Sequence, residues 1–284
     1  MSSIKLLSLA LIVALALFSS TRACADEGEK QSGALKREIA TWMKSYYKAP
    51  ESDKVVTMAK AMARLAAQEE LGPKEQIIPV MFFGKVMEAN PDKIEPWMAE
   101  LKSLPKQHYE DLCNAVWYSG TDAGNDWLTA NGREKLAKGP RPFLLAGKNA
   151  CLPMHLEELW QWFFATGDKA PVVKIVSVFE FAADLPPTDS LDLPRPPKQP
   201  TQQEIDAFKN GGAGQNQIDP KTKYLMRSQD FEMAGPAIWS TTSMVADHER
   251  LAKHLDELKD EVKKPKVAAW VNHVIKVAES RTKQ

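Results

Sequence analysis

The chain has 284 residues, of which 44% are hydrophobic, including 8 Trp and 10 Phe, and this excludes general disorder because such a chain can bury a substantial core. Its 37 basic residues balance its 37 acidic residues. A near-neutral chain lacks the clustered basic surface that nucleic-acid binding requires, and it offers no polybasic patch to an anionic membrane. We therefore predict no nucleic-acid partner.

The N-terminus is laid out like a secretory signal peptide. Lys5 supplies a positive region, an apolar run covers residues 6–18, and an Ala-Cys-Ala sequence at 23–25 precedes Asp26. The run is shorter than the ~20 residues of a spanning helix, and no other stretch is long enough. We predict that residues 1–25 are removed and that the mature protein is periplasmic or secreted, with no integral membrane segment.

Removal of the signal peptide leaves two of the three cysteines, Cys113 and Cys151. An isolated pair in an oxidising compartment is a candidate disulfide, and we predict that these two residues are bonded. The alternative is a pair of buried free thiols, since Cys packs well as a small hydrophobe. Cleavage also removes Lys5 and Arg22 but no acidic residue, so 37 basic residues become 35 against 37 acidic ones and the mature net charge is −2.

Apolar residues recur at helical spacing along most of the chain, and this pattern predicts an all-α fold. The densest apolar run starts at Ile77 and continues to Met87, and a helix that is apolar on nearly all sides must be covered on nearly all sides. We expect it to be the central buried helix. Residues 172–181 are rich in β-branched side chains. We predict a helix there as well, because no second strand is available to pair with a lone strand.

The mature chain divides into three parts by composition: a helical main domain, a Pro/Gly-rich linker or strap, and a C-terminal helical hairpin, over residues 26–185, 186–235 and 236–284. The middle part holds six prolines between 186 and 200, which prevent a regular helix there. After them, Thr201 and Glu204 form a capping-box pattern that predicts one short helix. In the last part we expect one long helix from Ala237 until Pro265.

Helical hairpins joined by Pro-containing turns resemble α-solenoid proteins in general, and the likeness is one of architecture only. It implies an array of about four to six hairpins, and such arrays commonly offer extended concave binding surfaces. The middle part of the chain adds apolar side chains that a solvated linker does not need. They either pack onto the helical body or form a recognition segment that orders on binding. The candidate partner-binding residues are Tyr224, Leu225, Met226 and Phe231.

The motifs of common catalytic and cofactor sites are incomplete in this sequence. His248-Glu249 begins like the zinc motif HExxH, but Ala252 stands where the second His belongs. The glycine cluster at 211–214 lacks the Gly-Lys-Ser/Thr ending of a P-loop. We therefore predict no cofactor, no metal site and no identifiable catalytic residue.

These observations favour a non-enzymatic binding or scaffold protein of the cell envelope, with a protein partner. Two alternatives stay open. One is a periplasmic hydrolase with dispersed acid and base residues, which two carboxylates facing each other across a cleft would favour. The other is a small-molecule carrier that uses the aromatic residues, which a closed apolar cavity would favour.

Cleavage after Ala25 is the first testable prediction. Mass spectrometry of the exported protein should find Asp26 at its N-terminus, because the small residues of the cleavage site lie directly before it. A mature chain that begins at an acylated Cys24 would contradict the prediction and attach the protein to a membrane. Arg22 argues against that outcome, since it stands where a lipoprotein signal has a small residue.

Overall fold

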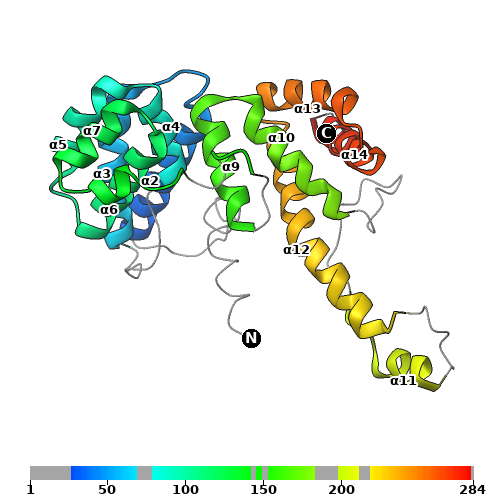
Figure 1. Cartoon of the computed structure of the whole chain (residues 1–284). Coiled ribbons are helices and arrows are strands. Elements are labelled where there is room, and N and C mark those ends of the chain that lie inside the picture. The colour runs from blue at the N-terminus through cyan, green and yellow to red at the C-terminus, as the bar shows by residue number, and fades with distance from the viewer. Residues whose placement is uncertain are drawn as a thin grey trace. The chain divides into compact units, whose positions relative to one another are not determined.

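The structure is a computed structural model that describes residues 27–68, 79–141, 145–148, 153–182, 198–210 and 218–282. Within these residues the chain is helical and holds no strand, so the predicted all-α class is confirmed (Figure 1). The finer prediction, a solenoid-like array of hairpins, stays a prediction. None of the helices in the described part is long and apolar enough to cross a membrane.

The chain forms two compact units, and α9 (Pro153–Thr166) contributes residues to both. Unit 1 comprises Met1–Lys148 and Glu157–Asp168, and unit 2 comprises Asn149–Leu156 and Lys169–Gln284. This division differs from the predicted boundary at residue 185, because 169–182 belong with the C-terminal helices. Besides the end of α9, unit 1 contains α2 (Glu27–Ser45), η2 (Ser52–Lys54), α3 (Val55–Gln68), α4 (Val80–Glu88), η3 (Pro91–Lys93), α5 (Ile94–Leu101), α6 (Lys106–Ser119), α7 (Asp122–Ala130) and α8 (Glu134–Ala137).

Helix α4 is the centre of unit 1, as the sequence predicts. Every residue from Val80 to Met87 is buried, Lys85 included. Phe82 meets Trp42 and Tyr46 of the N-terminal segment edge to face, with ring centroids 5.3 and 5.4 Å apart. Such aromatic pairs add to the stabilisation that burial of their area already provides.

Gly84 allows α4 and α6 to pack closely. A Cβ atom placed on Gly84 would lie 2.6 Å from Cβ of Tyr118 and 3.1 Å from the carbonyl oxygen of Ala115. Both neighbours belong to α6, so the backbone of α4 runs directly against that helix. Only glycine fits this contact without displacing one of the helices.

In unit 2 the helices η4 (Val178–Ala182), α12 (Pro220–Met244) and α14 (Pro265–Thr282) pack together. The second half of α12 is the buried part, with Ala234, Ala237 and Ile238 fully covered. The remaining helices of unit 2 are α10 (Lys169–Ser177), α11 (Gln202–Asn210) and α13 (Glu249–Glu261). Residues 172–181 are thus helical, α in the first part and 3-10 in the second.

The region 186–235 contains more helix than the sequence interpretation allowed. The capping box predicted at Thr201 is present, since its Oγ1 accepts from the Glu204 amide at 3.3 Å and its own amide donates to the Glu204 carboxylate at 2.7 Å. Residues 220–235 lie within α12, which begins at Pro220 after the cap residue Asp219, whose carboxylate accepts from the amides of Lys221 and Thr222. The prediction of an irregular strap is wrong for these residues, while 183–197 and 211–217 lie outside the described part.

The long helix predicted from Ala237 is interrupted. α12 ends at Met244, a turn follows, and α13 starts at Glu249 with His248 as its N-terminal cap residue. The His248 side chain is buried, 3% exposed. It therefore lies in the turn between two helices and not on a helical stripe.

Gly84→Ala should destabilise the protein by about 1–3 kcal/mol, because the new methyl group overpacks the contact between α4 and α6. Thermal and urea denaturation measure the loss. Gly33→Ala is the matched control, since Gly33 also lies within a helix but a Cβ there meets only the far end of Arg37, at 3.6 Å. Helix propensity predicts that this control is neutral or stabilising. Equal stabilities of the Gly84 variant and the parent would show that α4 and α6 pack differently.

Candidate functional site

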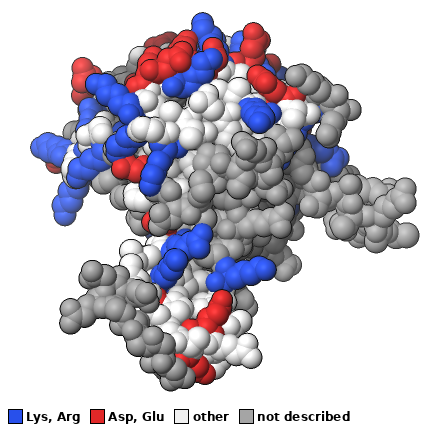
Figure 2. Space-filling view, turned by 90° about the vertical axis from the view of Figure 1, so that its right-hand side faces the viewer, with Lys and Arg blue, Asp and Glu red and all other residues white. Residues whose placement is uncertain are grey.

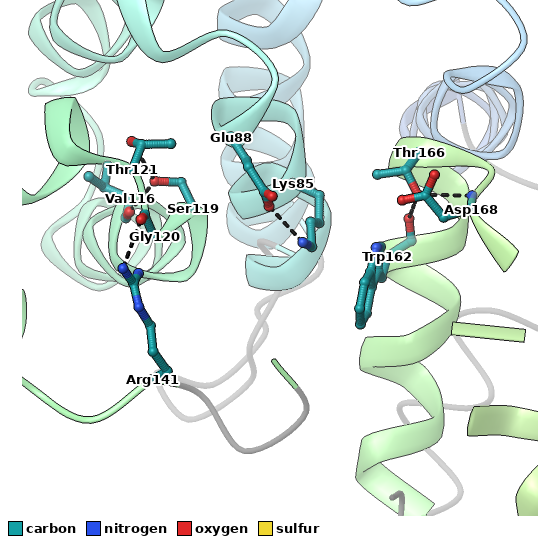
Figure 3. A network of polar contacts seen from close by, with 10 residues as sticks. All are labelled: Lys85, Glu88, Val116, Ser119, Gly120, Thr121, Arg141, Trp162, Thr166 and Asp168. Carbon is teal, nitrogen blue, oxygen red and sulfur yellow. Dashed lines mark hydrogen bonds and ion pairs between the residues drawn. The ribbon is translucent and has the colours of Figure 1, made fainter. Parts of the chain in front are cut away.

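Lys85 is a buried cation in the middle of the central helix. Its residue is 8% exposed, its ammonium nitrogen lies 2.6 Å from Oε2 of Glu88, and the same nitrogen stands 4.4 Å from the centroid of the Trp162 ring. The carboxylate and the ring face both stabilise a positive charge. Figure 3 shows Lys85 and Glu88 on α4, with Trp162 on α9.

Gln161 joins the same two helices one turn away. Its Oε1 accepts from the backbone amides of Met81 at 3.1 Å and Phe82 at 3.4 Å, which are among the first amides of α4. The cap residue Pro79 offers no side-chain acceptor to them. A side chain from α9 therefore caps the central helix, which satisfies donors that a buried helix start would otherwise leave unpaired.

Two carboxyls of α9 complete this cluster. The hydroxyl of Tyr118 donates to Oε1 of Glu158 at 3.4 Å, and burial raises the pKa of Tyr118 to about 12. Burial is also the main cause that raises the pKa of Glu158, with the charge of Glu157 adding to it. Partial loss of solvent around its carboxyl also raises the pKa of Glu157, although the residue as a whole is exposed, and its Oε1 accepts from Gln161 at 3.4 Å.

The contacts of this α4–α6–α9 cluster hold three helices together. Glu157 and Glu158 are neighbours on one helix, so their side chains diverge by about 100° and do not face each other across a cleft, as the acid and base of a glycosidase do. Lys85 is held by an acid and a ring. The described contacts join three helices of unit 1, and they supply no argument for the hydrolase alternative.

Two further hydrogen bonds lie at the C-terminal end of α6. The hydroxyl of Ser119 donates to the carbonyl oxygen of Val116 at 2.6 Å, and Arg141 donates to the carbonyl oxygen of Gly120 at 2.8 Å. Figure 3 shows the Arg141 side chain pointing toward Gly120 at the end of α6. Gly120 has φ +63°, the left-handed conformation of a helix C-terminus.

Cys113 does not form the predicted disulfide in the structure. The residue is a free thiol on α6, fully buried, and Cys151 lies outside the described residues. Burial raises the pKa of Cys113 to about 11, so the reactive thiolate is disfavoured. The Cys113 side chain therefore acts as a small hydrophobe of the core, which agrees for this one residue with the alternative of two buried free thiols.

Close to this thiol, Arg133 binds Glu110 through two hydrogen bonds, of 2.5 and 2.9 Å. This bidentate pair holds the pKa of Glu110 below its ordinary value. It fixes the turn after α7 to α6. Within the described residues, no group of three His, Cys, Asp or Glu side chains is placed to hold a metal ion.

The candidate partner-binding residues all lie on the first half of α12. Leu225 and Met226 are exposed, at 59% and 51%, whereas Tyr224 and Phe231 are partly buried. Figure 1 shows this half of the helix, with α11 beside its start, extending from the other helices of unit 2. The structure thus brings the four residues onto one helix, although it does not show what binds them.

Sequence reasoning missed the aromatic pair that continues this surface. Phe231 and Trp239 meet edge to face at 5.8 Å, and Trp239 is 37% exposed. Gly235 lies between them, and a Cβ there would stand 2.8 Å from the Phe231 ring. The spacing of four residues from Phe231 to Gly235 and from Gly235 to Trp239 is the signal that could have identified a shared helix face.

Charged residues of both signs are interspersed on the face that Figure 2 displays, in agreement with the balanced composition. Comparison with models of protein families, with curated proteins and with solved structures found no match for this chain.

The α4–α6–α9 cluster predicts a specific pH dependence. The folded protein holds the Glu158 proton more tightly than the unfolded chain does, so ionisation of Glu158 costs stability as the pH rises through its raised pKa. Glu158→Gln cannot ionise. Its melting temperature relative to the parent should therefore rise between about pH 4 and about pH 7, measured by calorimetry.

Glu110→Gln serves as a control of opposite sign. In the parent, Arg133 lowers the pKa of Glu110, so the Glu110–Arg133 pair stabilises the fold at neutral pH. This stabilisation is lost as the pH falls through the lowered pKa. The variant should lose at most about 1 kcal/mol near pH 7, because the pair is partly exposed, and nothing in acid. If the stabilities of the two variants relative to the parent changed with pH in the same direction, the opposite pKa shifts assigned to Glu158 and Glu110 would be wrong.

Proposed function

We propose that this chain is an exported, non-enzymatic binding or scaffold protein of the cell envelope, and that the first half of α12 is its binding element. Export is supported by the signal-peptide pattern of residues 1–25. The observation that carries the proposal is the exposure of large apolar side chains on one helix, Leu225 at 59% and Met226 at 51%. Large apolar side chains that stay exposed on a protein surface can mark an interaction site.

The position of these residues within unit 2 supports a binding role over a folding role. The second half of α12 already supplies the buried contacts, through Ala234, Ala237 and Ile238. The first half packs against α11 and still leaves Leu225 and Met226 open to solvent. A helix that leaves large apolar side chains exposed in this way suits recognition of a protein partner, whose own apolar surface would cover them.

The protein partner is identified by its chemistry. An apolar surface complementary to Leu225 and its neighbours is needed at the centre, and both signs of charge are needed at the rim, because Lys221 and Glu232 flank it. A strongly basic or strongly acidic ligand would meet like charge at one end. The all-helical architecture supports the scaffold role. We further propose that the helices form a solenoid-like array of hairpins.

Leu225→Asp should remove partner binding without unfolding the protein. A charge at the centre of an apolar contact leaves an unpaired ion on binding, which should reduce capture at least about tenfold. Tagged mature protein is incubated with envelope extract, and the retained proteins are quantified by mass spectrometry. The melting temperature should change by less than about 2 °C, since the side chain is exposed.

Val173→Asp is the matched control, because Val173 is an exposed apolar residue of the same unit, 43% exposed, on α10. It should capture the same proteins as the parent. Equal capture by the Leu225 variant would show that α12 is not the binding element. Loss of capture by both variants would show that binding follows general surface hydrophobicity.

A further inference from the structure

An exposed seam with coiled-coil spacing runs along the first half of α12. Lys221, Leu225, Ser228 and Glu232 follow one another at intervals of four, three and four residues. At about 100° per residue the four side chains fall within an arc of about 60°. Lys221, Leu225 and Glu232 are exposed and Ser228 is partly exposed, so neighbouring helices of the chain do not cover the seam.

The residues beside the seam differ on its two edges. Tyr224 and Phe231 border one edge, and they stand seven residues apart, directly before Leu225 and Glu232. Thr222 and Gln229 border the other edge at the same spacing. The seam is therefore bordered by aromatic side chains on one edge and by polar side chains on the other.

We propose that this seam pairs with the same seam of a second copy of the chain, with the two α12 helices antiparallel. The inference rests on the proposed function, since it names the partner of that binding element. In one antiparallel register Lys221 of each copy lies opposite Glu232 of the other. In the same register Leu225 of each copy lies opposite Ser228 of the other, so a large side chain meets a small one in both central layers.

The edges agree with this register. Tyr224 of one copy lies beside Phe231 of the other, and Thr222 lies beside Gln229, so aromatic meets aromatic and polar meets polar. A parallel pairing would place Lys221 against Lys221 and Glu232 against Glu232, which is unfavourable at both ends. The reversal of charge along the seam is thus complementary to itself only when the helices run in opposite directions, as they do about a two-fold axis perpendicular to them.

The length of the seam sets the strength expected. Twelve residues from Lys221 to Glu232 span about 17 Å of helix, which is less contact than a standard protein interface provides. The dimer should therefore be reversible and dependent on concentration. Sedimentation velocity of the purified mature protein should show that the fraction of dimer increases with protein concentration up to about 0.1 mM.

Charge reversal tests the register. Lys221→Glu and Glu232→Lys each place like charges opposite one another twice per dimer, so each should weaken the dimer about tenfold. The double variant exchanges the two signs and should restore dimerisation. An equimolar mixture of the two single variants should form a heterodimer, because each then meets the opposite charge. Lys223→Glu is the matched control, since Lys223 is exposed but lies about 160° from Lys221 around the helix, and it should leave dimerisation unchanged.

Each other outcome overturns the inference. A purified protein that stays monomeric at about 0.1 mM has no self-pairing of the expected strength. If the charge reversals do not change the dimer, the dimer forms through another surface. If the double variant does not restore the dimer, the two helices pair in another register. These results come from the purified chain alone, whereas the proposed function is read from capture out of envelope extract. If the purified protein is a monomer and its Leu225→Asp variant no longer captures some other protein, self-pairing is wrong and the proposed function is retained.

Discussion

The fold of unit 1 depends on the burial of α4 along its whole length. A buried helix must have its first amides satisfied and its neighbours close, and the chain meets both conditions with side chains far away in sequence. Gln161 of α9 accepts the amides of Met81 and Phe82, and Gly84 admits the backbone of α6. Each contact forms only in the assembled unit, so α4 and its neighbours stabilise one another cooperatively.

The burial of α4 also explains why ionisable groups of unit 1 are paired with other side chains. Lys85 lies on a helix covered on every side, and its charge is stable there because Glu88 and the ring of Trp162 lie within reach. Tyr118 and Glu158 pair across α6 and α9 for the same reason. Perturbed pKa values often mark active sites, and in this cluster the contacts between the described groups connect helices.

Much of this fold follows from local pattern, and the missed parts follow from tertiary context. The density of apolar residues after Ile77 predicts the burial of α4, and the capping box at Thr201 predicts a short helix. The burial of Lys85 has no local signal, since it requires a ring from α9. Proline content led to the prediction of an irregular strap through 235, yet Asp219-Pro220 is a favourable helix start, with a capping carboxylate followed by proline at the first position. The pairing of Cys113 depends on distances that spacing alone does not give.

Helix α12 concentrates two opposite demands in one element. Its second half is rich in small residues and is buried, with Ala234, Ala237 and Thr241 fully covered. Its first half carries larger side chains and is exposed, with Leu225 as the extreme. One helix, from Pro220 to Met244, joins the packed half to the exposed half, and Pro236 inside it leaves out one backbone hydrogen bond because proline has no amide hydrogen. If the exposed half binds a partner, as we propose, its side chains project from a helix that is already formed, so less conformational freedom is lost on association than for a disordered segment.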